Sequence, residues 1–195
     1  MALGSPTAPY DLRFDSGRIC LDLLATTHPG ERLDSVDRLR AWIAGAGLVP
    51  VGTPLAAAEP RWLPPFRELR GDIGQLVRGE LEGRPADTAL TRVNAVARAA
   101  PPAPCAVRGA DGGLVRRLRP LPGCEELLAV VAREAIELLT DPVTRAALRQ
   151  CEGDNCPLVY LDMSRGRRRL WCSSEVCGNR ERVARHRRRA ALARA

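Results

Sequence analysis

Four cysteines near the C-terminus constrain this chain more than any other feature. The stretches CEGDNC and CSSEVC each separate two cysteines by four residues, and fifteen residues lie between the pairs. Thiolate is a soft ligand, and Zn²⁺ takes four such sulfurs in a tetrahedral shell at about 2.3 Å. We therefore predict one zinc ion bound by Cys151, Cys156, Cys172 and Cys177. Because four protein ligands leave no open position, the ion is expected to be structural rather than catalytic.

The spacing alone leaves two alternatives for these cysteines, four free thiols or two disulfides. No stretch approaches the roughly 18 apolar residues of a membrane span, and MALGSPTAPYDLRF has neither a basic start nor the hydrophobic run of a signal peptide. We expect a cytoplasmic protein with no membrane partner, in which thiols stay reduced, and this favours the metal. Cys20, Cys105 and Cys124 occur singly and are interpreted as ordinary core or surface residues.

Positive charge is concentrated in the same part of the chain. All 30 basic residues are arginine, and residues 151–195 hold 11 of them against 5 acids, which accounts for +6 of the net +7. Guanidinium groups pair bidentately with phosphate, and each neutralised phosphate releases counterions. This density of charge favours a nucleic acid over a merely solvated face. The predicted contacts are Arg165, Arg167, Arg168, Arg169, Arg180, Arg182, Arg185, Arg187, Arg188 and Arg189.

The cysteine pairs and the arginines are expected to form one small module. A strand over Leu158–Leu161 and a basic loop connect the pairs, and Leu158, Tyr160 and Trp171 are predicted to pack over the metal. Asn179 is the predicted cap of a basic helix after Cys177. The zinc site would then fix the start of this helix and hold its guanidinium groups on a defined surface. His186 lies among the arginines, but four cysteines complete the shell without it.

The first 148 residues predict a mainly helical domain. The run at 18–27 fits a buried strand or a helix, and we favour the helix. Helices are also predicted at 35–47 with Ser35 as N-cap, at 66–76, from a cap at Asp87 with Leu90 and Val93 on the buried face, and at 125–139. Asp-Gly within 109–113 predicts a β-hairpin, and Asp141-Pro142 should start a short helix that ends at Cys151. The fold class is α+β, with domains at 1–148 and 149–195.

Residues 151–189 resemble the CGNR-type zinc finger of bacterial proteins. Its tetrapeptide stands here as Cys177-Gly178-Asn179-Arg180, and the D-x-S-R stretch is present as Asp162, Ser164 and Arg165. Upstream, ICLDLLATT and SVDRLRAWIAGAGLV resemble the L-D-F-x-N-T signature and the following helix of the ABATE domain, with Leu23 in place of the usual aromatic residue and Ala25 in place of the usual asparagine. The resemblance implies a stress-induced transcriptional regulator whose finger binds DNA.

The leading hypothesis is a transcriptional regulator that binds duplex DNA and whose N-terminal domain senses a small-molecule effector or forms a homodimer. RNA binding is a second hypothesis, weakened by an aromatic content of 4%. A third is a zinc-stabilised module that recruits an acidic protein. An enzyme is not expected, because the chain has two histidines, His28 and His186, and lacks H-E-x-x-H, G-x-S-x-G and a Walker-type phosphate loop.

Overall fold

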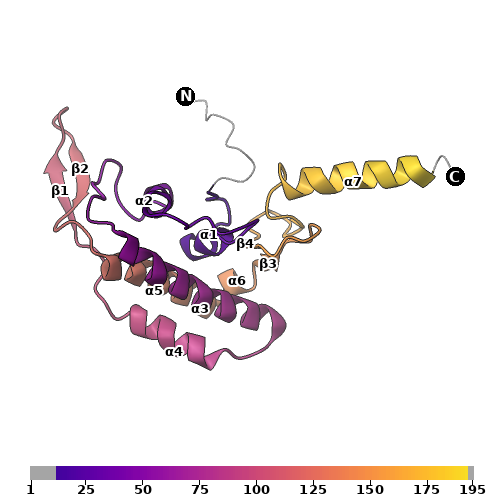
Figure 1. The fold of residues 1–195 in the computed structure, drawn as a ribbon, viewed down its shortest axis with the longest axis horizontal. Coiled ribbons are helices and arrows are strands. Elements are labelled where there is room, and N and C mark those ends of the chain that lie inside the picture. Colours follow the sequence, from indigo (N-terminus) through magenta and orange to yellow (C-terminus); the bar gives the residue numbers. More distant parts are fainter. Residues whose placement is uncertain (1–11, 193–195) are drawn as a thin grey trace.

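A computed structural model describes residues 12–192, except for the side chains of Arg188 and of residues 190–192. Its N-terminal part is built on three helices, α3, α4 and α5, which contact one another, while α1 packs against α3 and α5 (Figure 1). The helices are α1 (Ile19–Ala25), α2 (Val36–Gly45), α3 (Leu63–Glu82), α4 (Asp87–Val96), α5 (Cys124–Thr140), α6 (Pro142–Arg145) and α7 (Cys177–Leu192), with a 3-10 turn at Pro60–Trp62.

One apolar core fills the space between these helices. Trp42 and Phe66 are fully buried, and their rings meet edge to face with centroids 6.0 Å apart. Leu127 and Leu138 present the apolar stripe of α5 to the same cluster. Burial of such side chains removes apolar surface from water and is the main force that holds the helices together.

The α+β prediction is confirmed, with a mostly helical N-terminal region and a β-hairpin. Strands β1 (Pro104–Arg108) and β2 (Leu114–Leu118) pair antiparallel around the predicted turn. Ser35 caps α2 as expected, since its hydroxyl accepts a hydrogen bond from the amide of Arg38.

Two details of α4 were predicted wrongly. The helix starts at Asp87 itself, and Asp87 makes no side-chain cap. Leu90 is 44% exposed, whereas Ala89 and Val93 are buried. The buried face of α4 therefore contains Ala89 and Val93, which are four residues apart. The sequence pattern had assigned Leu90 to this face in place of Ala89.

The segment that leads into the cysteines also differs from the prediction. The short helix α6 ends at Arg145, and strand β3 (Leu148–Gln150) follows before Cys151. This strand pairs antiparallel with β4 (Val159–Leu161), with Leu148 opposite Leu161. Both leucines belong to the main core, so burial against the helices favours the strand. The division into domains at residue 148 stays a prediction, and Val159 and Leu161 from the second part belong to the main core.

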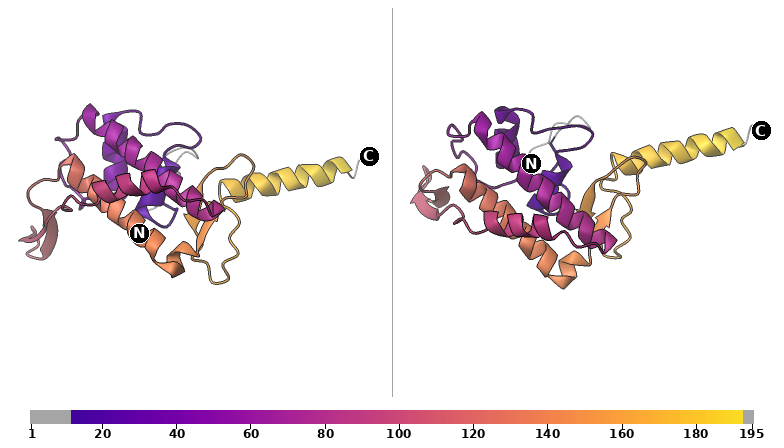
Figure 2. Two further views of the ribbon diagram at one scale, coloured as in Figure 1. Left: turned by 90° about the horizontal axis from the view of Figure 1, so that it is seen from below. Right: turned by 60° about the horizontal axis from the view of Figure 1, so that its bottom comes forward.

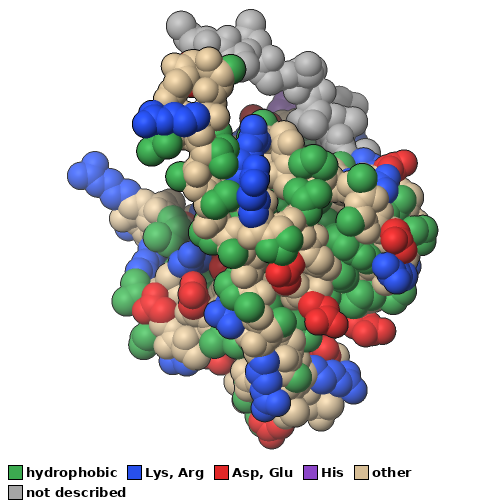
Figure 3. Space-filling view, turned by 90° about the vertical axis from the view of Figure 1, so that its left-hand side faces the viewer, with side chains coloured by type: hydrophobic (Ala, Val, Ile, Leu, Met, Phe, Trp, Pro, Cys, Tyr) green, Lys and Arg blue, Asp and Glu red, His purple; other side chains and the backbone are tan. Residues whose placement is uncertain are grey.

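The molecule has two very different ends. The β1–β2 hairpin protrudes at one end, and α7 extends from the other into solvent in every view (Figures 1 and 2). On the hairpin end, basic and acidic side chains are interspersed (Figure 3). Among the described helices, none has the length and apolar character needed to cross a membrane.

Candidate metal centre and basic helix

The four predicted cysteines meet in one buried cluster. Their sulfur atoms all lie within 4.8 Å of one another, and the Sγ of Cys172 lies 3.7 Å from that of Cys156 and 3.6 Å from that of Cys177. A tetrahedral shell with Zn–S bonds of about 2.3 Å requires sulfurs about 3.8 Å apart. A disulfide would need about 2.0 Å, so the disulfide alternative is wrong. The donor set and its spacing fit a single structural zinc ion.

Backbone amides surround the sulfurs and favour the charged, metal-binding thiolate. The Sγ of Cys151 accepts hydrogen bonds from the amides of Gly153 and Cys172, at 3.4 and 3.2 Å. Gly153 lies close to the second cysteine pair, because a Cβ atom there would lie 3.1 Å from the Cβ of Cys177 and 3.3 Å from its sulfur. A larger residue at this position would have to push the two cysteine loops apart by a few tenths of an ångström.

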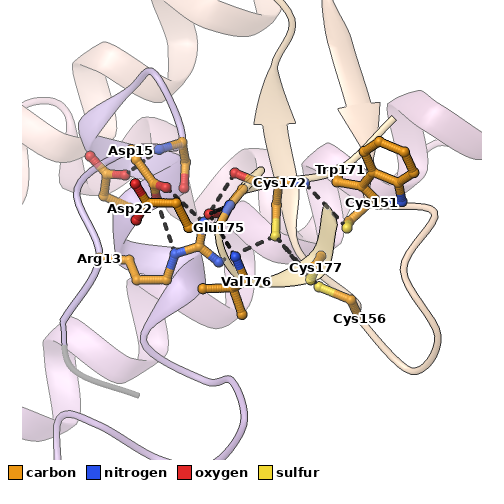
Figure 4. Close-up of polar contacts among 12 residues, drawn as sticks. Arg13, Asp15, Asp22, Cys151, Cys156, Trp171, Cys172, Glu175, Val176 and Cys177 are labelled. Atoms are coloured by element: carbon orange, nitrogen blue, oxygen red, sulfur yellow. Dashed lines mark hydrogen bonds and ion pairs between the residues drawn. The ribbon is translucent and has the colours of Figure 1, made fainter. Parts of the chain in front are cut away.

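Arg13 reaches the cluster from the other end of the chain (Figure 4). Its guanidinium donates to the Sγ of Cys172 at 3.2 Å and to the carbonyl oxygen of Cys172 at 3.0 Å, and it pairs with Asp15 at 2.8 Å. A hydrogen bond from the Cys156 thiol, together with Arg13, lowers the pKa of Cys172 well below its ordinary value. Such partners behind a ligand orient it and strengthen metal binding.

A small apolar layer covers the cluster. Tyr160 is fully buried, Leu158 is 4% exposed, and Trp171 is partly buried against the same group. The predicted packing of these three residues over the metal is confirmed. Four of the seven buried residues in this layer are the cysteines themselves, so without the ion little apolar surface remains to hold the module together.

Asp162 organises the basic loop between the cysteine pairs. Its buried carboxylate accepts hydrogen bonds from the amides of Ser164 and Arg169, each at 3.0 Å. Hydrogen bonds from Ser164, and then from the Arg169 amide, lower the pKa of Asp162. This Asx-type turn gives the D-x-S-R stretch a structural meaning, since it holds the loop in a conformation that turns Arg165 outward.

The arginines of this loop fall into two groups. Arg165, Arg167 and Arg168 are exposed. Arg169 is instead engaged within the module, because its guanidinium lies 4.4 Å from the centre of the Tyr160 ring and donates to the carbonyl oxygens of Trp171 and Cys172. Of the four predicted loop contacts, Arg169 is therefore bound to the module's own structure.

Helix α7 begins at Cys177, and the prediction that Asn179 caps it is wrong. The ligand itself is the first helical residue, and the hydroxyl of Ser173 in the preceding turn accepts hydrogen bonds from the amides of Glu175 and Val176. Because the metal ligand and the helix start coincide, zinc binding fixes the direction in which α7 leaves the module.

The charge on α7 covers more than one face. Successive residues are rotated by about 100°, so Arg182, Arg185 and Arg189 share one side, and Arg180 and Arg187 lie on the opposite side. All five are exposed. Arg182 also donates to the carbonyl oxygen of Ser174 at 3.2 Å. The side chain of Arg188 lies outside the described part of the molecule.

Neither histidine takes part in the cluster, which in the described part of the chain consists of the four cysteines alone. His186 is exposed on α7. His28 borders an open hollow of about 630 Å³ beside the first cysteine loop. Burial lowers the pKa of His28, and the nearby Arg180 adds to the effect.

Two residues that shape this centre, Arg13 and Gly153, were not predicted. Arg13 lies 159 positions from Cys172, and no local pattern links residues so far apart. Gly153 could have been recognised, because a glycine inside a short loop between two ligands often marks a close approach of backbone to the metal cage.

Two family models match the chain. The ABATE model, described as "Putative stress-induced transcription regulator", matches residues 17–142. The model described as "CGNR zinc finger" matches residues 147–190 and includes all four clustered cysteines. A comparison with curated proteins gives no match.

Proposed function

The chain belongs to the ABATE family, whose model is described as "Putative stress-induced transcription regulator", and on that premise we propose that it binds duplex DNA through the zinc-anchored helix α7. The observation that carries this proposal is the geometry of that helix. It leaves the metal centre at Cys177 and extends into solvent (Figure 2), and its arginines are exposed on two sides. The protein would act in the cytoplasm, without catalysis, and with one structural zinc ion.

The dimensions and charge of α7 suit the major groove. Its 16 residues span about 24 Å, and a groove about 12 Å wide admits one helix with phosphates on either side. Arginines on opposite sides, such as Arg185 and Arg187, could then reach both strands. The exposed loop arginines Arg167 and Arg168 lie in the same module and would add phosphate contacts.

Duplex DNA fits the module better than single-stranded RNA does. Binding of unpaired bases relies on exposed aromatic rings. Tyr160 is fully buried and Trp171 packs against the cysteine layer. The module therefore offers guanidinium groups without a stacking surface in its described part. A homodimer would double the recognised site, because one short helix contacts few base pairs.

A matched pair of arginine variants tests the proposal. Arg185→Ala removes an exposed guanidinium from α7, and Arg116→Ala removes an exposed one from the hairpin. In a salt titration of duplex binding, the first variant should lower the slope of log K against log salt by about 0.9, the value of one phosphate contact. The second should leave it unchanged. Equal effects of the two variants would mean that α7 has no special role and would contradict the proposal.

A further inference from the structure

A partly enclosed cavity of about 250 Å³ lies between helix α3 and the zinc module. Its lining includes Leu24 of α1, Thr27 two residues after that helix, and residues 157–159, which directly follow the ligand Cys156. The cavity therefore joins the helical domain to the metal centre, and it lies apart from the exposed arginines of α7.

Three arginines of α3 line this cavity, and no acidic residue does. Arg70 is buried and already paired, since it donates to both carboxylate oxygens of Glu31, at 2.8 and 2.5 Å. Arg67 donates to the carbonyl oxygen of Leu33 at 2.9 Å. Arg78 has no hydrogen bond or ion pair to any other described residue. Its guanidinium therefore retains donors for an anion.

Two glycines one turn apart, Gly71 and Gly74, also line the cavity. Glycine inside a helix costs up to about 1 kcal/mol relative to alanine. At Gly74 a Cβ atom would lie 3.2 Å from a guanidinium nitrogen of Arg78, which reaches back along the helix to this residue, and 3.5 Å from Leu24. At Gly71 a Cβ would meet nothing within 4 Å. The backbone of α3 is thus left bare at Gly71, one turn before the glycine that the Arg78 guanidinium approaches.

We propose that this cavity binds a small organic carboxylate. The carboxylate would accept paired hydrogen bonds from the Arg78 guanidinium, whose planar fork matches it. The apolar body of the molecule would lie over Gly71, against Val77 and Leu158. The volume lies just below the range of drug-sized pockets, about 300 to 1,000 Å³, so the ligand is a compact one.

Such a ligand would touch both parts of the molecule at once. Leu158 accepts a hydrogen bond at its carbonyl oxygen from the amide of Cys151, at 2.9 Å. A molecule seated between α3 and residues 157–159 therefore bears directly on the first cysteine loop. This coupling gives the proposed regulator its effector, and only this consequence rests on the proposed function, because the binding itself does not involve DNA.

Calorimetric titration of the zinc-loaded full chain with benzoate, in the absence of DNA, tests the proposal. Benzoate combines a carboxylate with a compact ring, and benzamide has nearly the same shape without the charge. We expect saturable binding of benzoate and at least tenfold weaker binding of benzamide, since a charged hydrogen bond contributes about 1.5 to 3 kcal/mol.

Two variants locate the binding to this cavity. Arg78→Gln should weaken benzoate at least tenfold, whereas Arg116→Gln on the hairpin should not change it. Gly71→Leu should fill the space and abolish binding while the helix is retained, because a Cβ atom at Gly71 meets no neighbour within 4 Å and leucine is a strong helix former. Absence of benzoate binding, or binding as tight as that of the wild type in Arg78→Gln or in Gly71→Leu, would overturn the proposal. Neither result would affect the test of DNA binding, which uses Arg185→Ala without benzoate.

Discussion

The helical domain and the zinc module are stabilised in different ways. The helical domain has a continuous apolar core, in which residues such as Trp42 and Phe66 are fully buried. The buried layer of the zinc module contains only seven residues, and four of them are cysteines. In that module the metal takes the place that a hydrophobic core holds in the helical domain.

The difference shows that the two regions depend on each other to different extents. Strands β3 and β4 reach into the main core through Leu148, Val159 and Leu161, so the zinc module relies on the helical domain for part of its packing. The helical domain receives little from the cysteine layer beyond the contact of Ala25. We therefore expect metal loss to remain local and core damage to affect the whole molecule.

Removal of zinc is the largest predicted perturbation of this asymmetry. Structural zinc in small fingers contributes about 10 to 16 kcal/mol of apparent binding free energy at neutral pH. In Cys177→Ser, or after chelation, amides of residues 151–180 should lose protection from hydrogen exchange, while those of α3 and α5 keep it. Cys105→Ser serves as the control, because this half-buried cysteine lies in the hairpin. Protection of the module in the metal-free protein would contradict the account.

Damage to the helical core should have a smaller effect per site but reach further. Leu138→Ala empties a fully buried position of α5 and is expected to cost about 2 to 5 kcal/mol. Urea unfolding followed by circular dichroism and by zinc release to a coloured chelator should then show both transitions shifted together. Zinc retained after the helices have unfolded would show that the module folds on its own.

Loss of Arg13 should weaken the metal centre without disturbing the core. Arg13→Ala removes two hydrogen bonds to Cys172, and the loss of such outer partners typically lowers metal affinity about 10- to 100-fold. We expect faster zinc transfer to a competing chelator, with helical stability changed by less than about 1 kcal/mol. Arg61→Ala removes only an exposed pair with Glu59 and is the matched control. An unchanged transfer rate in Arg13→Ala would contradict this role.

A pH effect on the helical domain is the smallest predicted. Burial raises the pKa of Asp22 from 3.8 to about 6, against the opposing hydrogen bond from the amide of Ser16. The neutral form is therefore favoured by folding, so this contribution to stability is full below about pH 4 and is lost as the pH rises through 6. The full contribution is roughly 3 kcal/mol, of which roughly 1 to 2 kcal/mol is lost between pH 5 and pH 7.5.

Asp22→Asn isolates that contribution, because asparagine keeps an oxygen for the Ser16 amide but does not titrate. The unfolding free energies of wild type and variant are measured at pH 5 and at pH 7.5. The stability of wild type relative to the variant should be greater at pH 5 than at pH 7.5, by roughly 1 to 2 kcal/mol. Comparing the two proteins cancels protonation of the cysteines, which both share. A difference that does not vary with pH would rule out the titration of Asp22.

The sequence predicted several local parts of this structure, although the caps expected at Asp87 and Asn179 were wrong. The spacing of the cysteine pairs, the cap at Ser35 and the turn at 109–113 are all encoded within a few residues, where steric and hydrogen-bonding preferences act directly. It missed features that depend on distant contacts. Strand β3 has only three residues and is stabilised because Leu148 is buried in the main core. Arg13 contacts Cys172 only after the whole chain has folded.

The candidate site shows the same division. The four ligands could be named from their spacing, but Arg169 looked like any other loop arginine until the fold placed it over Tyr160. No sequence pattern distinguishes Arg78 and Gly71 as binding residues, because an arginine and a glycine on a helix are common. Their proposed role follows from the cavity that α3 and residues 157–159 form together.

Fluorescence anisotropy of a labelled mixed-sequence duplex, titrated with zinc-loaded protein across a salt series and again after chelation, tests the central claim most directly. Single-stranded RNA of matched length is the comparison. We predict tighter binding to the duplex, a steep fall in affinity with salt, and loss of binding once the metal is removed. Equal affinity for both nucleic acids, or duplex binding that survives chelation, would contradict a zinc-anchored helix as the DNA-binding element.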